Sequence, residues 1–308
     1  MKCLVLGGGG FLGSHLSQAL LEAGHTVRIF DLPHRKRFAA APPQRLEWVE
    51  GDFANPDDLE PAVSGCDILY HLVCTTLPSS SNENPAYDVE TNVVSTLRLL
   101  DLARKKRGVK VIFVSSGGTV YGIPESVPLD ESHPTNPICS YGVTKLAVEK
   151  YLFLYRQLYG LDSCVLRLAN PFGERQEASV LQGAVSVFLN KAFHDEVIEI
   201  WGDGSVIRDY IYVKDAVDAL VRAAEHSGKD RLFNIGSGQG RSLNEILSEI
   251  GQVLGRPVRH AFAPARACDV PANVLDISLA RKSLGWRPRT SFQEGLRATL
   301  AWIKKGSS

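Results

Sequence analysis

The chain has 308 residues, of which 44% are hydrophobic and 22% charged, proportions that are ordinary for a globular protein. Its 34 lysines and arginines balance 34 aspartates and glutamates, so the composition gives no support for a nucleic-acid partner. No apolar stretch approaches the length of a membrane-spanning helix, and no membrane partner is predicted.

The cysteines and the N-terminus indicate the compartment. Six scattered cysteines contain no CxxC pair, so neither a metal site nor a disulfide framework is indicated. The apolar run 3–6 leads directly into glycines, which predicts a strand and not a signal peptide. We therefore expect reduced thiols and a cytoplasmic protein.

Short apolar runs alternate with helical patterns over roughly the first 170 residues. This alternation predicts an α/β fold, a doubly wound parallel sheet of the Rossmann type with helices on both faces. Runs such as 111–114 are continuously apolar, which is typical of strands buried on both faces. The predicted strands are 2–6, 26–31, 46–50, 67–73, 109–115 and 163–168, and the predicted helices are 12–23, 56–63, 91–107 and 141–159.

The regular alternation of strands and helices ends after about residue 170. Segment 231–236 has the pattern of another strand and is expected to return to the first unit. We therefore predict a larger domain of residues 1–173 plus 213–237, and a smaller α/β substrate-binding lobe of residues 174–212 plus 238–308. In this part the sequence predicts helices at 179–193, 215–226, 242–254, 278–284 and 291–304, and a strand at 197–201.

A glycine cluster follows the first predicted strand. Gly7, Gly10 and Gly13 fit GxxGxxG, and the same cluster read from Gly8 fits GxGxxG. Glycine permits a tight turn and lets the backbone approach a pyrophosphate at a helix N-terminus. A run of four glycines could equally be a flexible turn. Its place between a strand and an amphipathic helix favours a dinucleotide site.

Acidic residues follow the next two strands. Asp31 ends the second strand, where a carboxylate can accept both ribose hydroxyls of NAD and repels a 2′-phosphate. The basic cluster 35–37 argues for the phosphorylated cofactor, but we favour NAD. Asp52 and Phe53 follow the third strand, where an acid can reach the adenine amine; a helix-entry role explains Asp52 nearly as well.

A tyrosine and a lysine share one helix face at Tyr141 and Lys145. An ammonium near a phenol favours the phenolate and lowers the pKa of the phenol, as proton transfer requires. Tyr210 and Lys214 have the same spacing, but their segment alternates like a strand. The first pair opens a long helix after the hydroxyl-rich strand end 115–119, and we favour it as the catalytic pair.

In this order the motifs resemble the extended short-chain dehydrogenase/reductase family, specifically its nucleotide-sugar epimerases and dehydratases. The resemblance covers essentially the whole chain, and it also rests on the segments 71–72, 115–122, 167–173, 201–215 and 284–286. It implies bound NAD. By resemblance, the cofactor-binding residues are Gly7, Gly10, Phe11, Leu12, Gly13, Asp31, Asp52, Phe53, Leu72, Asn92, Ser115, Tyr141 and Lys145.

The resemblance also implies a mechanism. Tyr141 as phenolate takes a proton from a sugar hydroxyl, and Lys145 holds the nicotinamide ribose. Related enzymes usually carry a serine where this chain has Gly117, so the proton relay is expected from Ser116 or Thr119. Dehydratases carry carboxylates just before the Val-Tyr-Gly that this chain also has, and their absence here favours epimerisation at C4.

The substrate is expected to be a nucleotide sugar, most simply UDP-glucose or UDP-galactose. UDP-N-acetylhexosamine, UDP-hexuronate and a reductase or dehydratase of the same fold remain alternatives. By resemblance, Asn273 is at a gatekeeper position for an N-acetyl group, and its intermediate size leaves the sugar open. Two arginines suit a diphosphate, although surface solvation would also explain them. By resemblance, the substrate-binding residues are Ser116, Gly117, Thr119, Tyr141, Asn170, Gln182, Arg208, Arg266 and Asp269.

Apolar stripes mark two of the predicted helices. Leu97 and Leu100 lie on one, and Tyr151, Leu154, Tyr155 and Leu158 lie on the other. In the family such helices pair across a dimer as a four-helix bundle. Core packing within one chain is the alternative, and we predict a homodimer.

Overall fold

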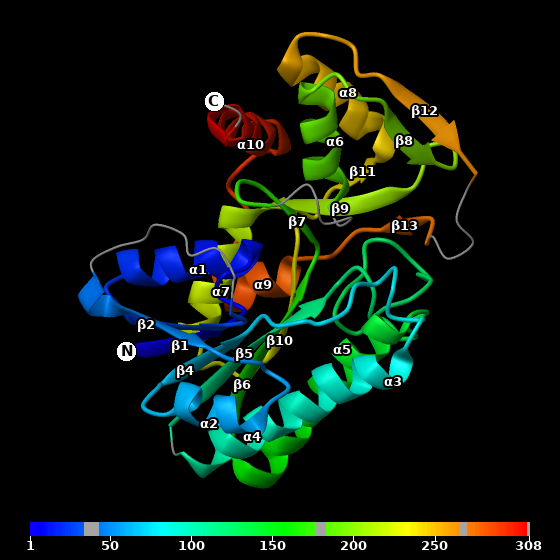
Figure 1. Cartoon of the computed structure of the whole chain (residues 1–308). Coiled ribbons are helices and arrows are strands. Elements are labelled where there is room, and N and C mark those ends of the chain that lie inside the picture. The colour runs from blue at the N-terminus through cyan, green and yellow to red at the C-terminus, as the bar shows by residue number, and fades with distance from the viewer. Residues whose placement is uncertain (34–42, 107, 177–182, 265–269, 307–308) are drawn as a thin grey trace.

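The computed structural model describes residues 1–33, 43–106, 108–176, 183–264 and 270–306 (Figure 1). Its centre is a seven-stranded sheet in which every pairing is parallel, which confirms the predicted fold class. The strands lie in the order β10 (Leu232–Ile235), β6 (Asp162–Leu168), β5 (Lys110–Ser116), β4 (Ile68–His71), β1 (Lys2–Leu6), β2 (Thr26–Asp31) and β3 (Leu46–Glu50), and a 3₁₀ turn (Pro43–Arg45) precedes β3.

Helices cover both faces of this sheet (Figure 1). Successive strand side chains point to opposite faces, so Val5 packs in one core and its neighbour Leu4 in the other. Both residues are fully buried, as expected for strands covered on both sides. The first core contains α1 (Phe11–Glu22), α7 (Val213–Glu225) and α9 (Ser278–Ser283), and the second contains α2 (Pro56–Val63), α4 (Ser95–Lys105) and α5 (Ser140–Tyr159).

The helix predicted at 91–107 differs from the observed structure. Helical backbone begins earlier, at α3 (Pro85–Asp88), passes through a π-helical segment (Val89–Val94) and continues as α4. Asn84 caps the start by accepting a hydrogen bond from the backbone of Tyr87, and proline suits the first helical position. The apolar periodicity indicated only the part that packs on the sheet.

The smaller lobe is built around β9 (Ile207–Tyr212). This strand pairs with β7 (Asn170–Phe172), β11 (Gly240–Ser242) and β13 (Ala272–Asn273). Three helices gather beside a separate strand pair at the top of Figure 1. These elements are α6 (Ala184–Phe193), α8 (Leu243–Leu254), α10 (Phe292–Gly306), β8 (Ile198–Trp201) and β12 (His260–Ala263). The start of the helix predicted at 179–193 lies outside the described residues, and four strands of two to four residues were not predicted.

The sheet has one topological switch point, at β1. The chain runs from β1 to β2 and β3 on one side, and to β4, β5 and β6 on the other. Ligands of such sheets bind where the strand order reverses, at the carboxyl ends of the strands. The glycine cluster follows β1 at this edge. None of the helices in the described part of the chain is both long and apolar enough to span a bilayer.

Candidate active site

The glycine turn after β1 forms a backbone surface without side chains. Gly7 has a φ of +82°, and its amide donates to the carbonyl of Phe30 at 2.8 Å. A Cβ added to Gly13 would lie 2.2 Å from the carbonyl oxygen of Gly7, so only glycine fits there. The turn is therefore shaped by close backbone approach, as a pyrophosphate site requires.

Helix α1 begins directly after this turn. Its N-cap residue Gly10 makes no side-chain capping bond, and no acidic residue lies in the first turn. Phe11 and Leu12, the first two helical residues, pack against the core and orient the helix end. Free N–H groups and the helix dipole together favour an anion at this point, so the residues present fit a dinucleotide.

Asp31 lies beside the glycine turn. One carboxylate oxygen accepts a hydrogen bond from the amide of Gly9 at 2.9 Å, and the other accepts from the amide of Leu32 at 2.9 Å. The structure thus places Asp31 against the glycine turn, and its binding to the cofactor stays a prediction. The basic cluster 35–37 lies outside the described residues.

The predicted adenine side is formed by the ends of β3 and β4. Asp52 is exposed, and its carboxylate accepts a hydrogen bond from the amide of Ala54 at 2.9 Å. Phe53 is buried with its ring centroid 4.9 Å from that of His71. Leu72 follows β4 and donates its amide to the carbonyl of Leu6 at 3.1 Å. These residues gather at the switch point.

His71 packs as a neutral residue at the end of β4. Its ring lies between Phe53 and Phe113, with centroid separations of 4.9 and 5.2 Å. A ring nitrogen shares a hydrogen bond with the Thr96 hydroxyl at 2.8 Å. Burial lowers the pKa of His71 to about 3, and the Lys145 ammonium acts in the same direction. Its role is therefore in packing.

The pair Tyr141 and Lys145 lies in the first turns of α5. The Lys145 ammonium donates to the carbonyl of Val114 at 3.0 Å, and it lies 4.8 Å from the ring centroid of Phe113 and 5.6 Å from that of Tyr141. The long α5 helix thus brings both side chains to the carboxyl end of β5. Tyr210 and Lys214, the competing pair, lie on β9 and α7, and Lys214 pairs with Glu174 at 3.2 Å.

The surroundings of the Tyr141 phenol favour its protonated form. Burial raises the pKa of Tyr141 well above its ordinary value. The nearby groups of Cys74, Cys139 and Asp88 raise the pKa further, whereas the Ser116 side chain lowers it. The phenol therefore needs a stabilising positive charge beside it to act as a base.

A buried polar network supports the end of β5. The Ser115 hydroxyl donates to the Glu149 carboxylate at 2.5 Å, and Glu149 forms an ion pair with Arg167 at 2.7 Å. The Arg167 guanidinium lies 4.8 Å from the ring centroid of Tyr121, whose hydroxyl donates to Asn234 at 2.6 Å. The network joins α5 to three strands. The Ser115 hydroxyl uses its proton to bond Glu149.

Gly117 is enclosed on its Cβ side. A Cβ at this position would lie 2.6 Å from Leu275 Cδ1 and 3.2 Å from the carbonyl oxygen of Arg167. The Asn273 amide donates to the Gly117 carbonyl at 3.0 Å. The Thr119 hydroxyl is buried and has no hydrogen-bond partner among the described residues. The leucine therefore occupies the space that a serine side chain would need.

The described part of the nucleotide end is organised by β9. The Arg208 guanidinium donates to the carbonyls of Ile207 at 2.9 Å and Val270 at 2.5 Å. The Asn170 amide on β7 donates to the carbonyl of Asp209 at 2.8 Å. Asn170 and Arg208 thus lie on paired strands, whereas the predicted residues Gln182, Arg266 and Asp269 lie outside the described residues.

Asp209 was not predicted, but it holds this region together. Its fully buried carboxylate accepts from the amide and hydroxyl of Ser237 at 2.8 and 2.6 Å. It also accepts from the amides of Gly238 at 3.1 Å and Leu275 at 3.3 Å. Burial raises the pKa of Asp209, and these hydrogen bonds oppose that rise. The position beside Arg208 in a strand was the only sequence signal for it.

Asn92 is held within the π-helical segment. Its side-chain oxygen accepts from the amide of Thr75 at 3.1 Å. Its side-chain nitrogen donates to the Thr75 hydroxyl and to the Asp88 carboxylate, both at 2.8 Å. Asn92 therefore fixes the loop that follows β4, on the same side of the sheet as the glycine turn.

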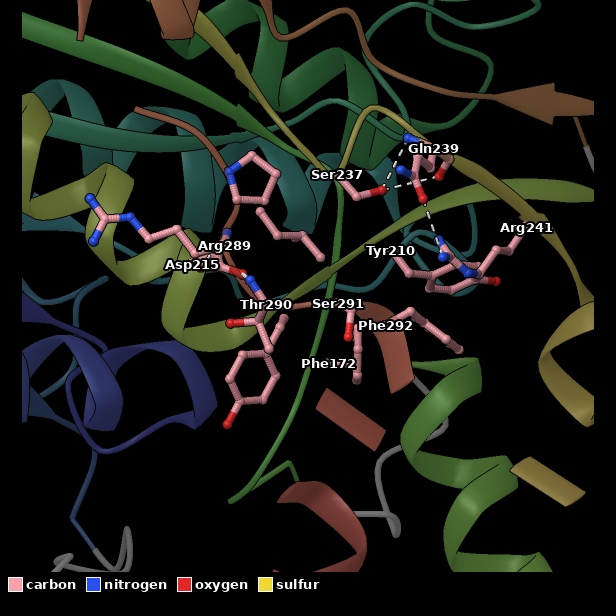
Figure 2. Close-up of a pocket in the computed structure, with 13 residues that line it drawn as sticks. Phe172, Tyr210, Asp215, Ser237, Gln239, Arg241, Arg289, Thr290, Ser291 and Phe292 are labelled. Atoms are coloured by element: carbon pink, nitrogen blue, oxygen red, sulfur yellow. Dashed lines mark hydrogen bonds between the residues drawn. The ribbon is translucent and has the colours of Figure 1, made fainter. Parts of the chain in front are cut away.

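A separate cavity of about 310 Å³ lies between β9 and the segment that leads into α10 (Figure 2). Arg241 lies 4.5 Å from the ring centroid of Phe292 and donates to Glu249 at 3.1 Å. Asp215 accepts from the backbone amides of Arg289 and Thr290 at 3.1 and 3.0 Å. The residues that line this cavity are not those predicted for catalysis.

The comparisons with known proteins agree with this geometry. Residues 3–236 match the family model described as the NAD dependent epimerase/dehydratase family. The chain belongs to this family. The matched segment contains the glycine turn, Asp31, and the Tyr141 and Lys145 pair.

Members of the epimerase/dehydratase family resemble the chain over its whole length. UDP-glucose 4-epimerase from Mycolicibacterium smegmatis is 35% identical and is covered over 100% of both chains. The structure of UDP-glucose 4-epimerase with UDP-glucose from Thermotoga maritima is 34% identical, with a TM-score of 0.94 and 100% coverage of both chains. That of Thermus thermophilus UDP-glucose 4-epimerase in complex with NAD has a TM-score of 0.90, 31% identity and 99% coverage of both.

One family member with another reaction is also similar. The dTDP-4-dehydro-6-deoxyglucose reductase of Escherichia coli is 32% identical, covering 98% of this chain and 97% of the reductase. The chain is therefore similar to epimerases and to a reductase. Overall similarity does not decide between the two reactions, and the choice depends on the residues of the site.

Proposed function

We propose that the chain is an NAD-dependent nucleotide-sugar 4-epimerase that interconverts UDP-glucose and UDP-galactose. The observation that carries the proposal is the position of Tyr141. The ring centroid of Tyr141 lies 5.6 Å from the Lys145 ammonium at the carboxyl end of β5, and the nearby Ser116 side chain lowers the pKa of the phenol. The full-length similarity to UDP-glucose 4-epimerases supports the same conclusion.

Proton transfer is assigned to Tyr141. NAD held at the glycine turn and Asp31 would supply the hydride acceptor for C4 of the sugar and, once reduced, the hydride donor to the opposite face. Tyr141 accepts the proton of the 4-hydroxyl as this bond is oxidised, and gives the proton back on reduction. Lys145 lies 5.6 Å from the ring centroid of Tyr141, so its positive charge stabilises the phenolate.

Ser116 is the best placed proton relay. Its side chain is close enough to the Tyr141 phenol to lower the pKa of that phenol, whereas the space around Gly117 is filled by Leu275. The Thr119 hydroxyl, which has no partner among the described residues, is left to bind the sugar. Ser116 would thereby replace the relay serine that related enzymes carry at the position of Gly117.

The remaining binding roles follow from the two ends of the site. Asp31 beside Gly9 is placed to accept the ribose hydroxyls of NAD, and the uncapped first turn of α1 to hold the pyrophosphate. Asn170 and Arg208 are assigned to the diphosphate of the sugar nucleotide. We also propose that the substrate contacts include Gln182, Arg266 and Asp269, as the family resemblance implies.

The deciding experiment compares two tyrosine variants. Purified protein is incubated with UDP-, dTDP- and GDP-linked sugars, and NMR identifies the products. We expect UDP-glucose and UDP-galactose to interconvert, and Tyr141→Phe to lower kcat by about 10²- to 10⁴-fold. Tyr210→Phe is the matched control, because Tyr210 has a lysine at the same spacing and is buried. A wild-type rate in Tyr141→Phe would end this proposal.

A reductase is the second candidate, because of the similarity to the E. coli enzyme. A reductase consumes nicotinamide stoichiometrically, which appears as a steady absorbance change at 340 nm. An epimerase regenerates its cofactor and shows no net change.

The identity of the sugar is tested in the same panel with UDP-N-acetylhexosamines, for which Asn273 is the proposed gatekeeper, and with UDP-hexuronates.

We also propose a homodimer that pairs through α5. Phe153, Leu154 and Leu158 on this helix are 64%, 42% and 62% exposed, which is high for large apolar side chains. Leu100 is instead fully buried in the chain's own core. Light scattering should give twice the chain mass, and Phe153→Glu should give monomers.

The free cysteines support a cytoplasmic location as part of this proposal.

The division into two domains is kept as a proposal with the predicted boundaries. Residues 1–173 plus 213–237 contain the seven-stranded sheet, and residues 174–212 plus 238–308 contain most of the nucleotide end. Strand β7 is an exception, since it lies before residue 174 but pairs with β9. Limited proteolysis that cuts first near these boundaries would support the division.

A further inference from the structure

Asp88 is a buried carboxylate that the proposed chemistry does not use. It is the last residue of α3 and has no exposed surface. One oxygen accepts from the Thr76 hydroxyl at 2.7 Å and the Asn92 amide at 2.8 Å, and the other accepts from the Ser140 hydroxyl at 2.7 Å. The Thr144 hydroxyl lies 3.4 Å from both oxygens. Burying a carboxylate is costly unless such bonds satisfy it.

The donors come from three segments that surround the site. Thr76 lies in the loop after β4, Asn92 in the π-helical segment, and Ser140 and Thr144 in the first two turns of α5. Ser140 and Thr144 lie on either side of Tyr141 in the sequence. One side chain therefore connects the loop, the π-helical segment and the helix that carries the phenol.

The same loop caps α5 directly. The N-cap residue Cys139 makes no side-chain capping bond. Instead, the amide of Ser140 donates to the Asn82 side chain at 2.8 Å, and the amide of Tyr141 donates to the Ser81 hydroxyl at 3.0 Å. The start of α5 is thus held by residues distant in sequence, and Asp88 joins that loop to the helix.

We infer that Asp88 is a positioning residue that sets the location of the Tyr141 phenol by fixing the first turn of α5 to the loop after β4. The inference rests on the proposed function of Tyr141. A displacement of about 1 Å at a reacting group can cost about a hundredfold in rate. The rate should therefore depend on Asp88 even though its carboxylate bonds only to other side chains of this region.

The variant set separates hydrogen bonding from charge. Asp88→Ala removes both. Asp88→Asn keeps an acceptor for Asn92 and Thr76, and its amide can donate to the hydroxyl oxygens of Ser140 and Thr144. Ser140→Ala removes one bond and leaves the carboxylate in place. Each variant is compared with wild type by kcat, KM, thermal unfolding and the amount of NAD retained.

We expect Asp88→Ala to lower kcat by about 10- to 100-fold while KM changes little and NAD stays bound. Ser140→Ala should lower it less, and Asp88→Asn should recover most of the wild-type rate at its own optimum. Asp88→Asn should also move the acid limb of the kcat profile to lower pH, because the phenolate is the active form and the Asp88 charge raises the pKa of Tyr141. Cys74, Cys139 and Lys145 are the other titratable groups beside the phenol, and they are unchanged.

Two controls distinguish the possible failures. Asp215→Asn changes a carboxylate that is 7% exposed and bonds to backbone amides at the separate cavity (Figure 2); it should lower stability and leave kcat unchanged. If Tyr141→Phe is fully active, the proposed function itself fails. If Tyr141→Phe is inactive but Asp88→Ala has the wild-type kcat and pH profile, positioning by Asp88 is refuted. Equal losses in Asp88→Ala and Asp88→Asn that match the unfolded fraction would also refute it.

Discussion

The contact between Gly117 and Leu275 gives a prediction that the structure allows us to quantify. In Gly117→Ser, the new Cβ would lie 2.6 Å from one methyl carbon of Leu275 and 3.1 Å from the other. Such overpacking of a well-packed core costs about 1–3 kcal/mol of unfolding free energy. The substitution that restores the family's usual serine should therefore destabilise this chain.

The complementary variant is Leu275→Ala. Leu275 is fully buried, and deletion of a buried leucine side chain costs about 2–5 kcal/mol through lost burial and the cavity left behind. In the double variant, the serine enters space that the leucine has vacated. We expect the double variant to be more stable than the sum of the single effects predicts, by about 1–3 kcal/mol.

Urea unfolding followed by tryptophan fluorescence measures the unfolding free energy of the wild type, the two single variants and the double variant. Gly118→Ser is the matched control, because its Cβ would meet nothing closer than the Ser116 hydroxyl at 3.9 Å. Its unfolding free energy should stay within about 0.5 kcal/mol of wild type. Full stability in Gly117→Ser, or strictly additive costs, would show that Leu275 does not exclude a serine from position 117.

Three further predictions concern other parts of the site. Asp31→Ala should weaken NAD binding and reduce the discrimination against NADP, as measured by titration calorimetry with both cofactors. Glu149→Ala should lose about 3–5 kcal/mol of stability in urea unfolding, because it leaves the Arg167 charge buried without its partner. The pKa of His71 is lowered to about 3 in the folded protein, so its stabilising contribution should be lost as the pH falls from about 6.5, where the unfolded chain begins to bind the proton. The urea midpoint of His71→Phe should accordingly depend less on pH than that of wild type over this range, and equal slopes would contradict the assignment.

The sheet was predictable because its signals are local. Each core strand is a short apolar run, and the glycine turn after β1 has its composition fixed by steric contact, as Gly13 shows. Asp31 was found because a strand end places its side chain at a known edge. The pair at Tyr141 and Lys145 needed only helical periodicity and its place after β5.

Other features could not be predicted, because they depend on contacts between distant segments. Nothing near Gly117 in the sequence indicates that Leu275 will fill the space beside it. Asp88 looks like an ordinary helix residue until Thr76 and Ser140 are brought to it by the fold. Strands of two or three residues, such as β11 and β13, are too short to have a period and exist because β9 pairs with them.

The Asp209 carboxylate has a consequence for how the chain folds. It lies on the central strand of the smaller lobe, but its partners Ser237 and Gly238 directly follow the last strand of the larger sheet, and Leu275 comes from a third segment. Full hydrogen bonding of this buried carboxylate therefore needs Ser237 from the proposed larger domain in addition to Gly238 and Leu275 from the smaller lobe, and we expect unfolding to be one cooperative transition. We expect a fragment ending at residue 236, where the family match ends, to contain Tyr141 but not to fold autonomously.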